Sequence, residues 1–126
     1  MNSLGQLELQ VMECFWKEGE LTVRQLWSKN DFQSRAYTTM MTTMNRLHRK
    51  GLLSRRSEKN AYVYWAAQSR EQYWKELSQT VISELMELGG TPILTGFVEA
   101  ALEKDMENLD HLEALILEKQ KKRGQS

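Results

Sequence analysis

The chain has 126 residues, 40% of them hydrophobic and 27% charged, and its 17 basic and 17 acidic residues give a formal net charge of zero. These proportions exclude an intrinsically disordered chain, and no stretch is long and apolar enough to predict a membrane span. The single cysteine, Cys14, excludes an internal disulfide framework and most cysteine-based metal sites.

The N-terminus has no basic segment followed by an apolar run, so we expect no signal peptide. We therefore expect a cytoplasmic protein with no membrane insertion.

The first predicted helix extends from Leu4 to Lys17. Its apolar residues recur every three or four positions, which is typical of one buried face of an amphipathic helix. These residues are Leu4, Leu7, Val11 and Phe15. Gly19 ends the helix, and the following Glu20-Leu21 is long enough only for a fragment of strand.

Two more helices are predicted before residue 51. Thr22 is a favoured N-cap, so the second helix is expected from Val23 to Ser28. A polar turn over residues 30–35 leads into a third helix from about Ala36 to Lys50. Gly51 then ends that helix, because glycine is favoured just beyond a helix C-terminus.

After Gly51 the period of the pattern changes from 3.6 to 2, as expected for strands. Two short runs that alternate in this way lie on either side of the polar turn Glu58-Lys59-Asn60, which predicts a β-hairpin. The order is helix, short strand, helix, helix, hairpin. Residues 1–68 are therefore predicted to form a winged helix-turn-helix domain.

Residues 69–126 are predicted to be helical. The capping box Ser69-Arg70-Glu71-Gln72 opens a long helix that Gly89-Gly90 closes. Thr91-Pro92 starts another helix, and a last one is expected from about Met106 to Lys122. The expected fold class is thus mainly α (an α+β winged helix-turn-helix) with a helical C-terminal dimerisation arm.

Charge is unevenly distributed along the chain. Residues 1–68 carry ten basic and six acidic side chains, whereas residues 69–126 carry seven and eleven. The segment from Arg35 to Lys59 alone contains seven basic residues and one acid. Such a local basic block favours an anionic partner at one face of the molecule.

The third helix has two different faces. Met40, Met44 and Leu47 form an apolar face that should pack on the first two helices, and the opposite face carries Thr, Asn and Arg. These are groups that hydrogen-bond base edges, contact thymine methyls or bind guanine and phosphate in a major groove. Threonine is a mediocre helix former, so four threonines at positions 38, 39, 42 and 43 need a reason beyond helix formation.

We therefore expect the third helix and the wing to contact double-stranded DNA, because phosphate contacts supply affinity and base contacts supply specificity. The expected DNA-binding residues are Arg35, Thr38, Thr39, Met41, Thr42, Asn45, Arg46, Arg49, Arg55, Arg56, Lys59 and Tyr62.

The second half has more apolar side chains than a thin helical arm can bury by itself. Since burying a large apolar side chain stabilises by about 1.5–3 kcal/mol, a homodimer interface is expected there. Its expected residues are Leu85, Leu88, Ile93, Leu94, Phe97, Val98, Leu102, Leu109, Leu112 and Ile116.

Several segments together resemble the penicillinase-repressor family (BlaI/MecI and CopY type). They are Leu7 to Trp16, Ala36 to Leu47, Arg49 to Leu53, Ala61 to Tyr64 and Ser69 to Glu71. The resemblance is dense over residues 4 to about 75. It implies a homodimeric transcriptional repressor whose winged helices bind a palindromic operator.

The resemblance also implies two routes by which repression is relieved. In the penicillinase branch a sensor-protease system leads to cleavage of an Asn-Phe bond, and the nearest match here is Gly96-Phe97, which lacks the asparagine. In the copper branch, paired C-terminal cysteines bind metal, and residues 69–126 contain no cysteine.

Other functions are less favoured by the residues. No Ser-His-Asp set, phosphate loop or zinc-binding spacing is present. We therefore expect that the protein is not an enzyme and that it has no cofactor and no metal site. The alternative function is a winged-helix protein-interaction module that binds an acidic partner. Because a basic wing accompanies a Thr/Asn/Arg helix face, DNA is the better fit.

Overall fold

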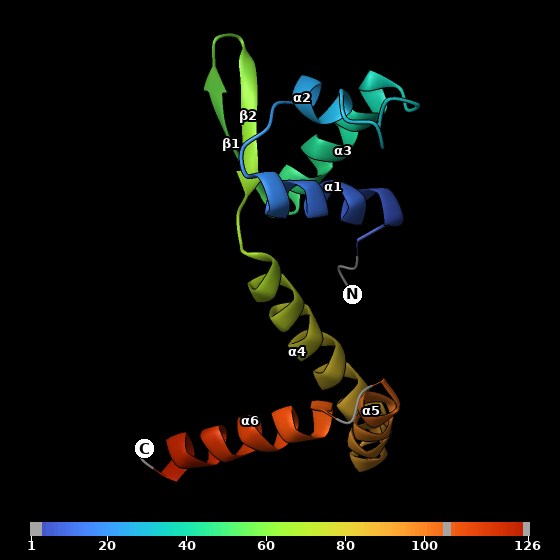
Figure 1. Cartoon of the computed structure of the whole chain (residues 1–126), viewed down its shortest axis with the longest axis vertical. Coiled ribbons are helices and arrows are strands. Elements are labelled where there is room, and N and C mark those ends of the chain that lie inside the picture. The colour runs from blue at the N-terminus through green and yellow to red at the C-terminus, as the bar shows by residue number, and fades with distance from the viewer. Residues whose placement is uncertain (1–3, 105–106, 125–126) are drawn as a thin grey trace. The chain divides into compact units, whose positions relative to one another are not determined.

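The computed structural model describes residues 4–104 and 107–124. Its elements in chain order are α1 (Gln6–Glu18), α2 (Val23–Trp27), α3 (Tyr37–Arg49), β1 (Leu53–Glu58), β2 (Ala61–Ala66), α4 (Arg70–Gly89), α5 (Thr91–Lys104) and α6 (Glu107–Gly124), as Figure 1 shows. The chain divides between Ser78 and Gln79 into two compact units. This confirms the expected mainly α class with a two-stranded wing.

The first unit is built around one apolar core. In Figure 1 the three helices α1, α2 and α3 lie together and the β1–β2 hairpin extends beside them. The side chains that fill the core come from all three helices, the hairpin and the segments on either side of α2. They are Val11, Met12, Phe15, Leu21, Leu26, Phe32, Met40, Met44, Leu47, Leu53 and Tyr64. The predicted apolar face of α3 is confirmed, since its three residues are fully buried.

The ends of α2 and α3 follow local side-chain and backbone chemistry. Thr22 caps α2 as expected: its hydroxyl accepts from the Gln25 N–H at 3.1 Å, and the Gln25 side chain accepts from the Thr22 N–H at 2.8 Å. After α3, Gly51 adopts φ +81° and donates to His48 O, while Leu52 donates to Leu47 O. This pair of bonds is a Schellman motif, which confirms the predicted role of Gly51.

The wing is an antiparallel hairpin whose register runs from Leu53 opposite Ala66 to Glu58 opposite Ala61. Its turn has two residues rather than the three expected, because Lys59 and Asn60 alone have positive φ (49° and 67°) and Glu58 still pairs. Positive φ at both central positions matches the right-handed twist of a hairpin. The expected strand fragment is a single bridge, in which Leu21 and Tyr64 exchange backbone bonds of 3.0 and 2.9 Å.

The start of α4 differs in one detail from the sequence expectation. The Ser69 hydroxyl accepts from the Gln72 N–H at 3.1 Å, as a capping box requires. The Gln72 side chain, however, donates to Glu76 at 2.7 Å. Only the serine half of the predicted capping box therefore forms, because the glutamine has a carboxylate acceptor one turn further along the helix.

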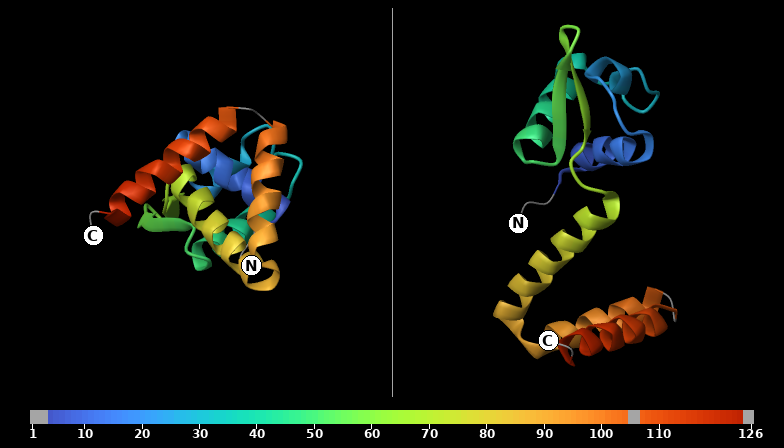
Figure 2. Two further views of the ribbon diagram at one scale, coloured as in Figure 1. Left: turned by 90° about the horizontal axis from the view of Figure 1, so that it is seen from below. Right: turned by 90° about the vertical axis from the view of Figure 1, so that its left-hand side faces the viewer.

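The second unit contains the rest of α4 with α5 and α6, and Figure 2 shows α5 and α6 as two successive helices. The backbone of Gly90 has φ +68°, which ends α4 before Thr91 starts α5, as predicted. The expected starting residue of the last helix, Met106, lies outside the described residues. No helix in the described ranges is long and apolar enough to cross a membrane.

Candidate nucleic-acid interface

The face of α3 turned away from the core is polar and accessible to solvent. Of the sequence-predicted residues on and before this helix, Asn45 is half-buried and the others are exposed. The exposed ones are Arg35, Thr38, Thr39, Met41, Thr42, Arg46 and Arg49. The fourth threonine of the helix, Thr43, is buried, and its hydroxyl donates to Thr39 O at 2.8 Å. The structure thus explains Thr43 by its burial and its hydrogen bond, and the other three threonines lie on the exposed face.

The turn before α3 is fixed by an aromatic residue of α2. The Trp27 indole N–H donates to the backbone oxygen of Arg35 at 2.9 Å. The same ring meets Tyr37 edge-on, with 5.6 Å between ring centroids. These contacts set where α3 begins and hold Arg35 beside its first turn.

The other end of α3 is joined to α1 through an ion pair. The Lys50 ammonium donates to both Glu8 carboxylate oxygens at 2.9 and 3.1 Å, and Glu8 is 8% exposed. Burial by itself raises the pKa of Glu8. The bonds from Lys50 and from the Gly5 N–H outweigh that effect, so the pKa of Glu8 lies below its ordinary value. The charged form of Glu8 therefore holds α1 against the end of α3.

A hydrogen-bonded group connects α3 to the wing, and sequence reasoning missed it. Asn45 Oδ1 accepts from Arg55 Nη1 at 3.0 Å and from the Tyr64 hydroxyl at 3.1 Å. Arg55 Nη1 also lies 3.3 Å from the Tyr64 hydroxyl, and the Arg55 guanidinium stacks 4.1 Å from the centroid of the Tyr62 ring. The Nη1 group of Arg55 is thus hydrogen-bonded inside the domain.

A two-residue turn at Lys59-Asn60 would have predicted part of this group. Such a turn sets Arg55 directly opposite Tyr64 in the hairpin, and that register is observed. The involvement of Asn45 has no comparable signal in the sequence, because it depends on how the hairpin packs against α3.

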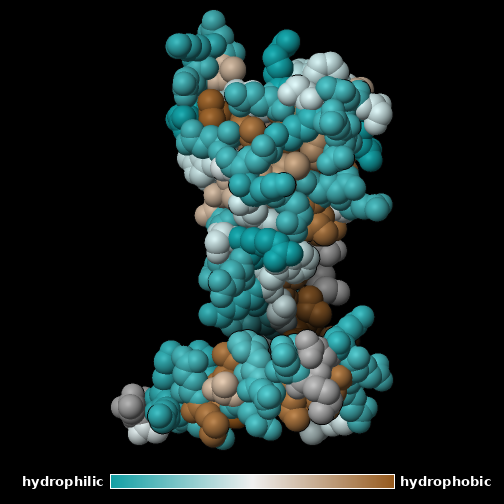
Figure 3. All heavy atoms as spheres, in the orientation of Figure 1, coloured by the Kyte–Doolittle hydropathy of each residue, from teal (hydrophilic) through white to brown (hydrophobic). Residues whose placement is uncertain are grey.

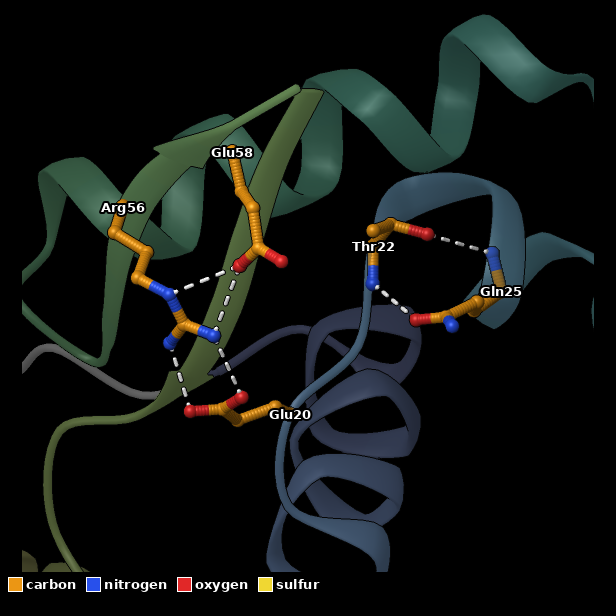
Figure 4. A network of polar contacts seen from close by, with 5 residues as sticks. All are labelled: Glu20, Thr22, Gln25, Arg56 and Glu58. Atoms are coloured by element: carbon orange, nitrogen blue, oxygen red, sulfur yellow. Dashed lines mark hydrogen bonds and ion pairs between the residues drawn. The ribbon is translucent and has the colours of Figure 1, made fainter. Parts of the chain in front are cut away.

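Arg56 points to the opposite face of the hairpin from Arg55. Its guanidinium donates to Glu20 at 2.8 and 2.9 Å and to Glu58 at 3.2 Å, as Figure 4 shows. The ring of Trp65 lies beneath it at 5.4 Å. The hydrogen bond from Arg56 lowers the pKa of Glu20. Of the three predicted wing cations, Arg55 faces α3, Arg56 is ion-paired, and Lys59 is exposed in the turn.

An open hollow lies between α2, α3 and the hairpin. Its lining includes Thr22, Tyr37, Met41, Asn45 and Tyr62. Three of these, Tyr37, Met41 and Tyr62, are large apolar side chains that remain exposed. The predicted residues Met41, Asn45 and Tyr62 are therefore brought together at one accessible concave surface.

The second unit leaves most of its large apolar side chains accessible, and neither α5 nor α6 has a buried residue within the described ranges. In Figure 3 brown hydrophobic residues lie among hydrophilic ones on the surface of this unit. Of the residues expected at a dimer interface, six are exposed and four half-buried. The exposed ones are Leu85, Leu88, Leu94, Phe97, Val98 and Ile116, and the half-buried ones are Ile93, Leu102, Leu109 and Leu112. Sequence reasoning missed Leu115 and Leu117, which are also exposed.

The bond between Gly96 and Phe97, the nearest match to the cleavage site of the resembled family, lies within α5. Both residues are exposed.

Comparison with known families gave one match that spans nearly the whole chain. The family model described as penicillinase repressor matches residues 4–118. No protein in a search of curated sequences matches the chain.

Two solved structures are similar to parts of the chain. The DNA-binding domain of the repressor BlaI shares 23% identity, with a TM-score of 0.49 over 54% of this chain and 84% of that one. A MarR family protein from Bacillus stearothermophilus shares 19% identity, with a TM-score of 0.47 over 85% of this chain and 76% of that one.

Proposed function

Since the chain belongs to the penicillinase repressor family, and is a transcriptional regulator, we propose that it represses transcription as a homodimer that binds a palindromic DNA operator. The observation that carries this proposal is the exposed polar face of α3 beside a basic wing. In this mode α3 lies in the major groove, where its hydroxyl, amide and guanidinium groups contact bases and phosphates. Lys59 at the tip of the wing contacts the neighbouring backbone.

The homodimer is supported by the apolar surface of the second unit. Leu88 is 86% exposed and Phe97 is 45% exposed, and other large apolar side chains of α5 and α6 are also exposed, among them Leu94, Ile116 and Leu117. A second copy of the same surface would bury them in a two-fold symmetric interface, at a gain of about 1.5–3 kcal/mol for each large side chain. Two winged helices related by such symmetry fit an operator with two matching halves.

We propose that repression is relieved by proteolysis in the second unit, through a sensor-protease system. The supporting observation is that the Gly96-Phe97 bond is exposed in a helix without buried residues. Local unfolding of such a helix is cheap, which gives a protease access to the backbone. Cleavage there would divide the proposed dimer surface.

Salt dependence of binding to a random DNA duplex tests the DNA-binding part of the proposal. Each phosphate that a basic side chain neutralises releases counterions, so the logarithm of the affinity should fall steeply and linearly with the logarithm of the salt concentration. A protein that binds no duplex even at low salt, and binds an acidic protein instead, would refute the proposed function.

A further inference from the structure

The bonds around Asn45 fix which way its side-chain amide points. Arg55 approaches one atom of this amide at 3.0 Å, and a guanidinium can only donate hydrogen bonds. The approached atom must therefore be the acceptor, Oδ1. If the amide were flipped, its NH₂ group would face the Arg55 guanidinium. The hydroxyl of Tyr64, a residue that is 1% exposed, would then face an amide donor in place of the oxygen to which it donates.

The oxygen of Asn45 is also fully used. A carbonyl oxygen has two lone pairs, and Oδ1 already accepts one bond from Arg55 and one from Tyr64. The amide nitrogen, Nδ2, makes no hydrogen bond to any of the described residues, and Asn45 lines the open hollow beside α3. The side chain thus presents two free N–H donors and no free acceptor.

This arrangement limits what Asn45 can recognise on DNA. Asparagine usually reads adenine with both ends of its amide, accepting from N6 and donating to N7. That mode needs a free oxygen. A donor alone is matched by acceptors in the major groove: guanine offers two adjacent ones, O6 and N7, whereas thymine offers only O4, adenine offers only N7 beside a donor, and cytosine offers only the N4 donor.

We propose that Asn45 acts as a donor-only reader, held in this orientation by Arg55 and Tyr64, and that it selects guanine in each half of the operator. This inference rests on the proposed function, because it requires α3 to lie in the major groove. Arg55 is then a positioning residue, because it acts on the operator only through the orientation of Asn45.

The test compares sequences that the wild-type protein and Asn45→Asp select from a random duplex pool. Aspartate keeps an oxygen for Arg55 and Tyr64 but replaces the outward donor by an acceptor, so the variant should fold, as far-UV circular dichroism would verify. The extra negative charge of the variant should weaken binding to every duplex to the same extent. The affinity of the variant for random DNA measures this general loss. At one position of each half-site the preferred base should change from guanine to cytosine, whose N4 group donates.

Arg55→Met is the matched control for positioning. It removes the donor that fixes the amide, so the same position should come to accept adenine as well as guanine. With the wild-type protein, replacing guanine at this position by 7-deazaguanine removes one acceptor and should weaken binding about threefold to tenfold, the value of one hydrogen bond.

Two results would overturn the inference while leaving the proposed function intact. One is an Asn45→Asp variant that folds, binds duplex and keeps the wild-type preference at every position. The other is a wild-type preference for adenine at the position that responds to this substitution. A wild-type protein that recovers no sequence from the pool would instead refute the proposed function itself.

Discussion

Arg46 and Arg56 are both exposed arginines with the same charge, but their surroundings differ. Arg46 lies on the outer face of α3, whereas Arg56 is held by two carboxylates on the far face of the hairpin. An arginine that already has carboxylate partners gains less from a phosphate, because the existing ion pairs must be broken first.

Arg46→Ala should therefore weaken operator binding by about 1–3 kcal/mol without changing the thermal stability of the protein. Arg56→Ala removes the same charge and is the matched control, with a smaller expected loss. Both are measured by fluorescence anisotropy with a labelled duplex. Equal losses for the two variants would show that the ion pairs of Arg56 do not compete with DNA.

Glu8 leads to a prediction on pH dependence. Its pKa in the folded protein is lowered from the ordinary value of 4.5. The contribution of the Glu8–Lys50 pair to stability is therefore complete above the unfolded pKa and is lost as the pH falls through the folded pKa.

Glu8→Gln should lower the free energy of unfolding at pH 7 by about 1–2 kcal/mol, since it leaves a charge-assisted bond unmade. The difference between wild type and variant should shrink as the pH falls from neutral into the acid range in which Glu8 becomes protonated. Urea denaturation at several pH values measures it. A difference that stays constant over this range would show that the charge of Glu8 is not what stabilises the contact.

At the level of elements, periodicity and end signals predicted most of the structure. The three- and four-residue spacing of Leu7, Val11 and Phe15 and the glycine at position 51 depend on local geometry alone, so they were readable in the sequence. The bonds of Asn45 to Arg55 and Tyr64 depend on the packing of the hairpin against α3, and the pairing of Arg56 with Glu20 depends on the segment before α2. No local pattern encodes these contacts. The exposure of the side chains on the proposed DNA-facing surface was thus predictable, but their orientation and existing partners were not.

The first turns of α4 pack on the winged helix. Tyr73 is buried, its ring lies 5.4 Å from that of Trp16, and the Trp16 indole donates to Gln68 O at 3.0 Å. The predicted first domain ends at residue 68, and the compact unit in the structure ends at Ser78. We infer that the beginning of α4 is part of the folding unit of the DNA reader.

A fragment of residues 1–78 should consequently be more stable than one of residues 1–68, by about 1.5–3 kcal/mol, the cost of exposing one large aromatic side chain. Tyr73→Ala in the longer fragment should remove most of this advantage, whereas Lys75→Ala, at an exposed position, should leave it unchanged. Chemical denaturation gives the free energies of unfolding of the two fragments and the two variants. Equal stability of the two fragments would place the boundary at residue 68.

The two halves of the chain differ in net charge and in exposed apolar surface. The excess of basic residues lies in residues 1–68, and the second unit combines an acidic excess with exposed leucines and Phe97. This division is expected of a protein whose first half binds a polyanion and whose second half binds a copy of itself.

Phe97→Glu should convert a dimer into a monomer at micromolar concentration, because it sets a charge in the apolar surface of α5. Sedimentation velocity measures the state. Glu103→Lys is the control: it reverses a charge at an exposed position about 80° or more around the helix from each expected interface residue of α5, and the dimer should persist. Loss of the dimer should also lower operator affinity by at least about tenfold, since the second winged helix no longer binds at high effective concentration. A wild-type protein that sediments as a monomer would refute the proposed interface.

Selection of bound duplexes from a random DNA pool with the wild-type protein tests the central claim most directly. A homodimer that reads DNA through α3 should recover a palindrome whose half-sites are centred about 10–10.5 base pairs apart, or a multiple of this, on one face of the duplex. Recovery of sequences without any common element, or of a single unrepeated half-site, would contradict a dimeric repressor that binds in this way.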